Sequence, residues 1–143
     1  MKTKVAIFAA IAALAVFAGA CSPAMGSPKR TTIGVGYDEF SQGKNISKQV
    51  TIAEGTELIV NLPANPSTGF SWTQPAIGTS AVLTQTDSKY VAPETNALGA
   101  AGNQVWTFSA SQKGTTAVKM DYSRPWQGGE KAEWTFALTV TVQ

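Results

Sequence analysis

The sequence predicts an all-β domain, an antiparallel immunoglobulin-like β-sandwich, and three observations support this prediction. From residue 31 onward, apolar and polar residues alternate with a period of two, as they do in strands with one buried face. Short turn sequences rich in Gly, Pro and Asn separate the alternating segments. No segment of this region has the 3.6-residue period of an amphipathic helix. A length of 143 residues suits one domain.

The N-terminal segment, residues 1–20, is predicted to be a bacterial signal peptide. Lys2 and Lys4 precede an apolar run from Val5 to Phe17, which is shorter than the about 20 residues of a membrane-spanning helix. Small residues then lead to Cys21, where ordinary signal cleavage and lipoprotein processing would cut the same bond. We therefore expect a cell-envelope lipoprotein of the periplasm or outer membrane, anchored through Cys21, with a soluble secreted protein as the alternative.

Residues 22–30 are rich in Ser, Pro and Gly and are predicted to form a tether. The expected organisation is a signal peptide over 1–20, anchor and tether over 21–30, and a folded domain over 31–143.

Within that domain the strongest strand is predicted at 134–142, where large apolar residues occupy every second position. The same alternation predicts strands at 106–110 and 118–122. Weaker patterns predict strands at Ile33–Phe40, Ser47–Ala53, Thr56–Leu62, Phe70–Thr73, Ala81–Thr86 and Lys89–Val91.

Three connections are longer than a hairpin requires: Ala64–Gly69, Ala92–Asn103 and Ser123–Lys131. If Ala81–Val91 counts as one traverse of the sandwich, one strand pair separates each connection from the next. Antiparallel strands reverse direction at every turn, so the three loops are expected to meet at one end of the sandwich.

The composition argues against an enzyme. The chain has no histidine, and its only cysteine is Cys21, so Ser-His-Asp or Cys-His catalysis and a His/Cys metal site are excluded. Without the signal peptide, nine basic residues (11 minus Lys2 and Lys4) balance nine acidic ones, which argues against a nucleic-acid partner. We expect a monomer that needs no metal and no cofactor.

Each of the three loops has two interpretations when taken alone. Asn65-Pro66 begins a turn, and Phe70 and Trp72 lie at strand spacing, which favours core positions. The small residues of 99–102 suit either close backbone approach or simple flexibility. Trp126, beside Arg124, suits an exposed interface residue, or alternatively a lid folded over the sandwich end.

Taken together and in this order, the loops resemble three motifs of the chagasin family, inhibitors of papain-like cysteine peptidases. The sequence has NPSTGFSW at 65–72, GAAG at 99–102 and YSRPW at 122–126, with Ala101 where the family tends to have glycine. The resemblance implies a wedge of three loops that enters the peptidase cleft and inhibits tightly. The residues it implies for peptidase binding are Asn65, Pro66, Ser67, Thr68, Gly69, Gly99, Ala100, Ala101, Gly102, Arg124, Pro125 and Trp126.

The resemblance also implies a role for each loop. Thr68 would lie near the catalytic thiolate, residues 99–102 along the non-primed side, and Trp126 against an aromatic residue of the primed side. Two other functions remain open: a cell-envelope binding module or adhesin that uses the same loop tip, and a purely structural lipoprotein domain.

Overall fold

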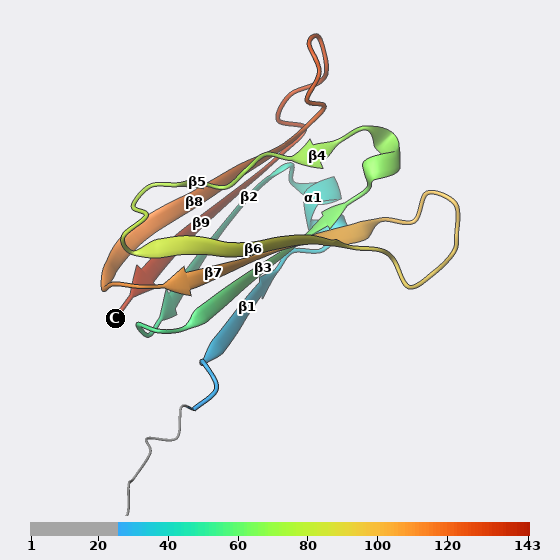
Figure 1. The fold of residues 1–143 in the computed structure, drawn as a ribbon. Coiled ribbons are helices and arrows are strands. Elements are labelled where there is room, and N and C mark those ends of the chain that lie inside the picture. Colours follow the sequence, from blue (N-terminus) through green and yellow to red (C-terminus); the bar gives the residue numbers. More distant parts are fainter. Residues whose placement is uncertain (1–25) are drawn as a thin grey trace, which may run out of the picture.

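The computed structural model describes residues 26–143. The predicted signal peptide and Cys21 lie outside the described residues. Two sheets pack face to face, with one short helix at one end (Figure 1). The elements in chain order are β1 (Arg30–Gly34), α1 (Tyr37–Gln42), β2 (Asn45–Ile52), β3 (Glu57–Ala64), the 3-10 turn η1 (Pro66–Thr68), β4 (Ser71–Trp72), β5 (Ala76–Ile77), β6 (Leu83–Val91), β7 (Gly102–Ala110), β8 (Gly114–Ser123) and β9 (Trp134–Val142).

One sheet has the strand order β1-β3-β7-β6 and the other β2-β9-β8-β4, with β5 also paired to β8. The immunoglobulin-like sandwich is confirmed. Its pairing is not antiparallel throughout, because β1 pairs with β3, and β2 with β9, in parallel. Consecutive strands β1 and β2 belong to different sheets, so the chain crosses the sandwich between them instead of forming a hairpin.

The core lies between the sheets and is built by the alternation seen in the sequence. Inward positions of β3, β7, β8 and β9 are almost completely buried, while the residues between them are half-buried or exposed, except for Pro63 and Ser123 near the loop ends of β3 and β8, which are buried. The largest fully buried side chains are Phe40, Phe108, Phe136, Leu58, Leu62, Leu83, Met120 and Leu138. Burial of each such side chain stabilises the fold by about 1.5–3 kcal/mol.

The predicted strand Ile33–Phe40 is wrong in its second half. β1 ends at Gly34, and a single helical stretch follows. Asp38 and Glu39 lie in the first turn of α1, where negative charge is favoured. The Glu39 carboxylate also accepts a 3.4 Å hydrogen bond from the Gly36 backbone N–H. This turn places Phe40 inside the protein, with none of its surface exposed.

The remaining predictions differ from the structure mainly at the ends of elements. Ala81–Thr86 and Lys89–Val91 form one strand, β6, whose register shifts between Gln85 and Asp87, so the single traverse is confirmed. Gly102 and Asn103 belong to β7, which shortens the second loop to 92–101, and the third loop is shifted to 124–133 because β8 includes Ser123 and β9 begins at Trp134. In the part of the chain that the structure describes, no helix is long and apolar enough to cross a membrane.

Candidate functional site at the loop tip

The three long loops meet at one end of the sandwich, as predicted (Figure 1). The end of β3 at Ala64 pairs with Gly102 at the start of β7, which brings the first loop beside the second. In the other sheet, Ser71 of β4 pairs with Ser123 at the end of β8. The third loop therefore leaves the sandwich where the first loop enters the second sheet.

The first loop is a tight turn closed by its own side chains. The Asn65 Oδ1 atom accepts hydrogen bonds from the Ser67 backbone N–H (3.3 Å) and the Ser67 hydroxyl (2.5 Å). The Thr68 hydroxyl donates to the Asn65 carbonyl oxygen at 2.7 Å. Gly69 ends the turn with φ of 79°, a left-handed conformation that favours glycine. Pro66, Ser67 and Thr68 are left exposed at the crest of the turn.

Asn65 also joins the first loop to the second. Its Nδ2 atom donates a 3.0 Å hydrogen bond to the Gly99 carbonyl oxygen. Its backbone N–H donates to the Tyr122 hydroxyl at 2.9 Å, which ties the loop to β8. Asn65 is thus a structural residue of the tip, held by bonds on three sides.

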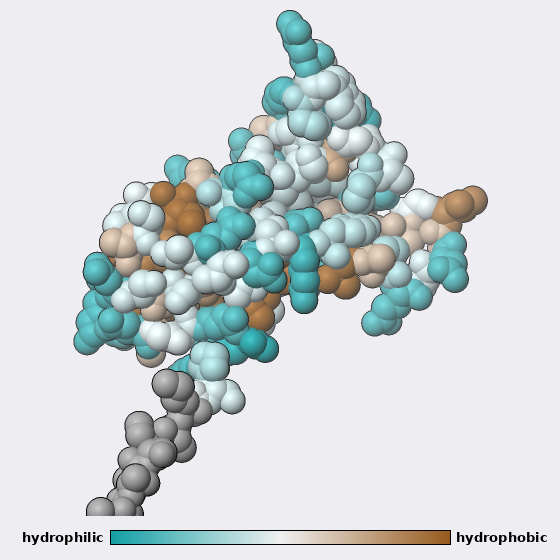
Figure 2. Space-filling view, in the orientation of Figure 1, coloured by the Kyte–Doolittle hydropathy of each residue, from teal (hydrophilic) through white to brown (hydrophobic). Residues whose placement is uncertain are grey.

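The second loop carries an exposed residue that does not belong to any of the three sequence motifs. Leu98 is fully exposed, at 104% of its reference area, and Figure 2 shows the apolar tip of this loop standing clear of the body. Of the residues that follow, Gly99 is exposed, and Ala100 and Ala101 are half-buried. Gly102 is buried against Val91 and Tyr90, where a Cβ atom has no room, so it offers no surface to a partner.

The third loop presents Trp126, for which the sequence allowed two interpretations, an exposed interface residue or a lid over the sandwich end. The residue is 51% exposed, and its indole lies against Gly69, where an added Cβ would stand 2.5 Å from the ring atom Cη2. One part of the indole thus packs on the first loop and the rest is open to solvent. Lys131 Nζ donates to the Trp126 carbonyl oxygen at 3.0 Å and also to the Arg124 carbonyl, which holds the loop backbone.

Arg124 turns towards the first loop. Its guanidinium carbon lies 4.4 Å from the centre of the Phe70 ring, a cation–π arrangement. Phe70 in turn stacks on Tyr122, with ring centres 5.3 Å apart. The expectation that Phe70 is a core residue is wrong, because β4 begins only at Ser71 and Phe70 remains in the loop. Trp72 does pack against the core, as expected.

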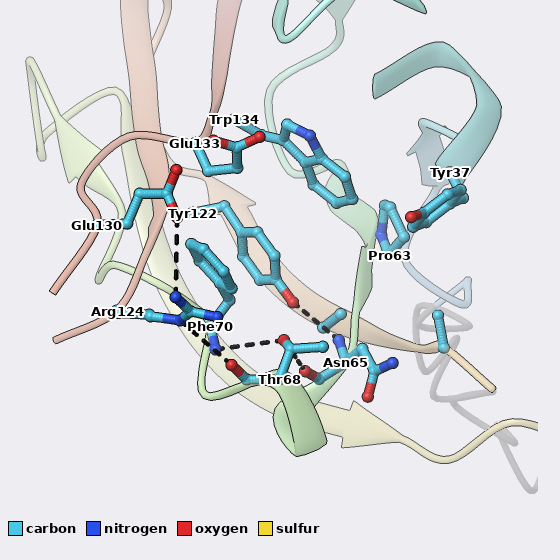
Figure 3. Close-up of a pocket in the computed structure, with 12 residues that line it drawn as sticks. Tyr37, Pro63, Asn65, Thr68, Phe70, Tyr122, Arg124, Glu130, Glu133 and Trp134 are labelled. Atoms are coloured by element: carbon cyan, nitrogen blue, oxygen red, sulfur yellow. Dashed lines mark hydrogen bonds and ion pairs between the residues drawn. The ribbon is translucent and has the colours of Figure 1, made fainter. Parts of the chain in front are cut away.

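A hollow of about 320 Å³ opens between α1 and the first and third loops (Figure 3). Tyr37, Pro63, Thr68, Glu133 and Trp134 are among the residues that line it. The carboxylate of Glu133 lies 2.5 Å from Lys44 Nζ. The hydrogen bond from Lys44 lowers the pKa of Glu133, and the same contact raises the pKa of Lys44.

The described residues of the tip form an exposed surface and include no group of metal ligands. Within residues 26–143, no three His, Cys, Asp or Glu side chains lie close enough together to hold a metal ion. The predicted binding residues fall into three sets. Pro66, Ser67, Thr68, Gly99, Pro125 and Trp126 are exposed, Ala100 and Ala101 are half-buried, and Asn65, Gly69, Gly102 and Arg124 support the loops from within.

Comparison with known proteins agrees with this geometry. Residues 51–140 match the family model described as chagasin family peptidase inhibitor I42. Chagasin of Trypanosoma cruzi is 34% identical over 84 residues, which cover 55% of this chain and 74% of chagasin.

Several solved structures share the fold. A cysteine protease inhibitor from Entamoeba histolytica is 16% identical with a TM-score of 0.59, covering 80% of this chain and 96% of its own. The solution structure of amebosin is 26% identical with a TM-score of 0.52, covering 82% of this chain and all of amebosin. PbICP-C, solved in complex with falcipain-2, is 17% identical with a TM-score of 0.54, covering 80% of this chain and 99% of its own. With a family match over most of the folded domain and a tip built from three converging loops, the chain belongs to the chagasin family of peptidase inhibitors and is not an enzyme.

Proposed function

We propose that the loop tip inhibits papain-like cysteine peptidases by filling their active-site cleft. The observation that carries this proposal is the contact among three loops far apart in sequence, which together present Thr68, Leu98 and Trp126 at one end. The complex of the related fold PbICP-C with falcipain-2 supports a peptidase of this class as the partner. The relatives are inhibitors, and they lend no support to an adhesin or a purely structural domain.

Each loop would take one part of the cleft. The crest Pro66–Thr68 would face the catalytic centre, and the second loop would lie along the non-primed side. We add Leu98 to the contact set. Its side chain is fully exposed, and its burial against a partner would remove apolar surface from water and so stabilise the complex. Trp126 would lie on the primed side, since large half-exposed aromatic residues commonly dominate interfaces.

The hydrogen bonds within the loops favour tight binding and resist cleavage. A tip already held in one conformation loses little entropy when it binds, and three loops can bury an interface of about 1,600 Å². Asn65 bonds keep Pro66–Thr68 in a 3-10 turn. The crest therefore offers no extended peptide bond in the alignment that nucleophilic attack requires.

A titration against papain tests the proposal. The folded part of the chain, residues 26–143, is added to active-site-titrated papain, and residual activity and inhibitor mass are followed over time. We expect stoichiometric loss of activity with an intact inhibitor, and no effect on trypsin, whose nucleophile is a serine. Steady cleavage of the domain by papain, without inhibition, would contradict the proposal.

We also propose the cellular form of the protein. Residues 1–20 direct export, Cys21 carries the lipid, the residues from 22 up to the start of β1 at Arg30 are the tether, and the domain acts as a monomer in the cell envelope. The apolar run, and the position of the only cysteine directly after small residues, support this proposal. Metabolic labelling with a palmitate analogue should mark the full-length protein but not a Cys21→Ala variant. An unlabelled wild-type protein would favour the soluble secreted form.

A further inference from the structure

Five side chains form a continuous stack beneath the tip, from the helix to the third loop. The ring of Phe40 in α1 lies 5.0 Å from that of Trp134, and Trp134 lies 5.0 Å from Tyr122, with planes 16° and 15° apart. Phe70 follows at 5.3 Å and 21°, and the guanidinium of Arg124 covers its outer face at 4.4 Å. Figure 3 shows Trp134, Tyr122, Phe70 and Arg124 of this series. Arg124 therefore lies at the loop end of the stack, and its guanidinium carbon is also 6.0 Å from the centre of the Trp126 ring.

The polar atoms of the same guanidinium also bond within the protein. Nε donates a 3.3 Å hydrogen bond to the Thr68 carbonyl oxygen, at the crest of the first loop. An outer nitrogen lies 3.8 Å from the Glu130 carboxylate in the third loop. The side chain keeps only 38% of its surface exposed. The partners of the guanidinium are thus all groups of the inhibitor itself: the Phe70 ring, the Thr68 carbonyl oxygen and the Glu130 carboxylate.

We propose that Arg124 is a positioning residue, which holds the first and third loops in their binding arrangement and makes no ion pair with the peptidase. The inference rests on the proposed function and reassigns a residue that the sequence placed among the peptidase contacts. A planar guanidinium can stack on Phe70 and donate to Thr68 at the same time, whereas a lysine ammonium cannot do both. Arg124→Lys therefore keeps the charge and removes the positioning.

Association and dissociation rates with papain distinguish the two roles. When only a fraction of the molecules holds the binding arrangement, affinity falls by that fraction and the loss appears in the association rate. We expect Arg124→Lys to slow association about tenfold while the dissociation rate changes less than about threefold. A direct charge contact predicts the opposite, a nearly normal association rate and faster dissociation, because the steering charge remains.

The matched control is Arg30→Lys, the same substitution at the first residue of β1, where Arg30 pairs with Glu57. It should leave both rates unchanged. Phe70→Leu and the double variant Phe70→Leu/Arg124→Lys complete a double-mutant cycle. If Arg124 acts through Phe70, the two single losses overlap and the double variant is little worse than either. Additive losses would overturn the inference.

Amide hydrogen exchange of the free inhibitor tests the same point without a peptidase. We expect faster exchange at Thr68, Gly69 and Phe70 in Arg124→Lys than in wild type or in Arg30→Lys, with strand amides unchanged. Unchanged exchange in the first loop would overturn the positioning role even if inhibition is lost. If the wild-type domain fails to inhibit papain, the proposed function falls, and this measurement still decides what Arg124 does.

Discussion

At the scale of single residues, Trp126 and Trp134 separate binding from folding. Trp126→Ala removes a half-exposed indole from the tip and should weaken inhibition of papain more than tenfold, since such residues commonly contribute at least about 2 kcal/mol. Its melting temperature should stay close to that of wild type. Trp134→Ala opens the stack between Phe40 and Tyr122 and should destabilise the domain by roughly 3 kcal/mol.

Thermal melts and inhibition constants on the same two variants check this prediction. Thr68→Ala belongs in the series, because it removes less surface and should cost less affinity than Trp126→Ala. An early melt with normal inhibition in Trp126→Ala would mean that this residue covers the sandwich end and does not bind.

Gly69 offers a second test at this scale. Gly69→Ala imposes a side chain on a left-handed backbone and places its Cβ against Trp126. The indole must move, so inhibition should fall by a factor similar to that of Trp126→Ala, with a stability loss of about 1–2 kcal/mol. Gly55→Ala is the matched control, because Gly55 also has φ of 79° and nothing lies within 4 Å of its added Cβ. Equal inhibition constants for the two variants would contradict the contact.

At the scale of elements, the strands could be predicted because their alternation is long and regular. The helix α1 could not, because six residues are too few to show a helical period. Val35, Tyr37 and the residues around them alternate well enough to suggest a strand. The helical conformation of this segment is decided by a tertiary contact, since the turn brings the Phe40 ring against that of Trp134.

The same distinction applies to the site. The meeting of the loops followed from counting strands, and the exposed crest followed from the motif. Arg124 points inward and Leu98 is fully exposed because of the way the loops pack on each other. Loop packing cannot be predicted from a periodic sequence pattern. Phe70 was misplaced for a related reason, because spacing shared with Trp72 does not reveal that β4 is only two residues long.

The helix can be tested as an element that supports the tip. Phe40 is completely buried and contacts both Trp134 and Trp72. Phe40→Ala should therefore lower the free energy of unfolding by about 3–5 kcal/mol, measured by urea denaturation. Ser41→Ala is the control on the exposed face of the same helix and should change stability by less than about 0.5 kcal/mol. Similar midpoints for the two variants would show that α1 is not part of the core.

At the scale of the whole molecule, the folded domain is held together by non-covalent interactions alone. The only cysteine of the chain, Cys21, precedes it, so the domain contains no disulfide. Cysteine peptidases require a reduced thiol, and an inhibitor without disulfides keeps its fold in the same reducing medium. The melting temperature of residues 26–143 should be the same with and without dithiothreitol.

The charges of the whole domain predict a broad pH range of constant stability. The chain has no histidine, so no type of side chain in it ordinarily titrates between about pH 5 and 8. A hydrogen bond from Lys48, helped by the Gly36 N–H, lowers the pKa of Glu39, and Lys44 lowers that of Glu133. A lowered folded-state pKa gives stability that is present above the ordinary value of about 4.3 and lost as pH falls through the folded value.

For Lys44 the sign is reversed, because contact with Glu133 raises its pKa. Its contribution is complete below the ordinary value of about 10.4 and disappears only as pH rises through the raised folded value. The melting temperature should therefore be flat from about pH 5.5 to 9 and fall in acid below about pH 4.5. Glu39→Gln should reduce the acid fall, since one of the carboxylates that must be protonated is then absent. If inhibition changes between pH 5.5 and 8 while the melting temperature stays constant, the change reflects a titrating group of the peptidase. A drop in melting temperature over that range would contradict the predicted pH-independent stability of the domain.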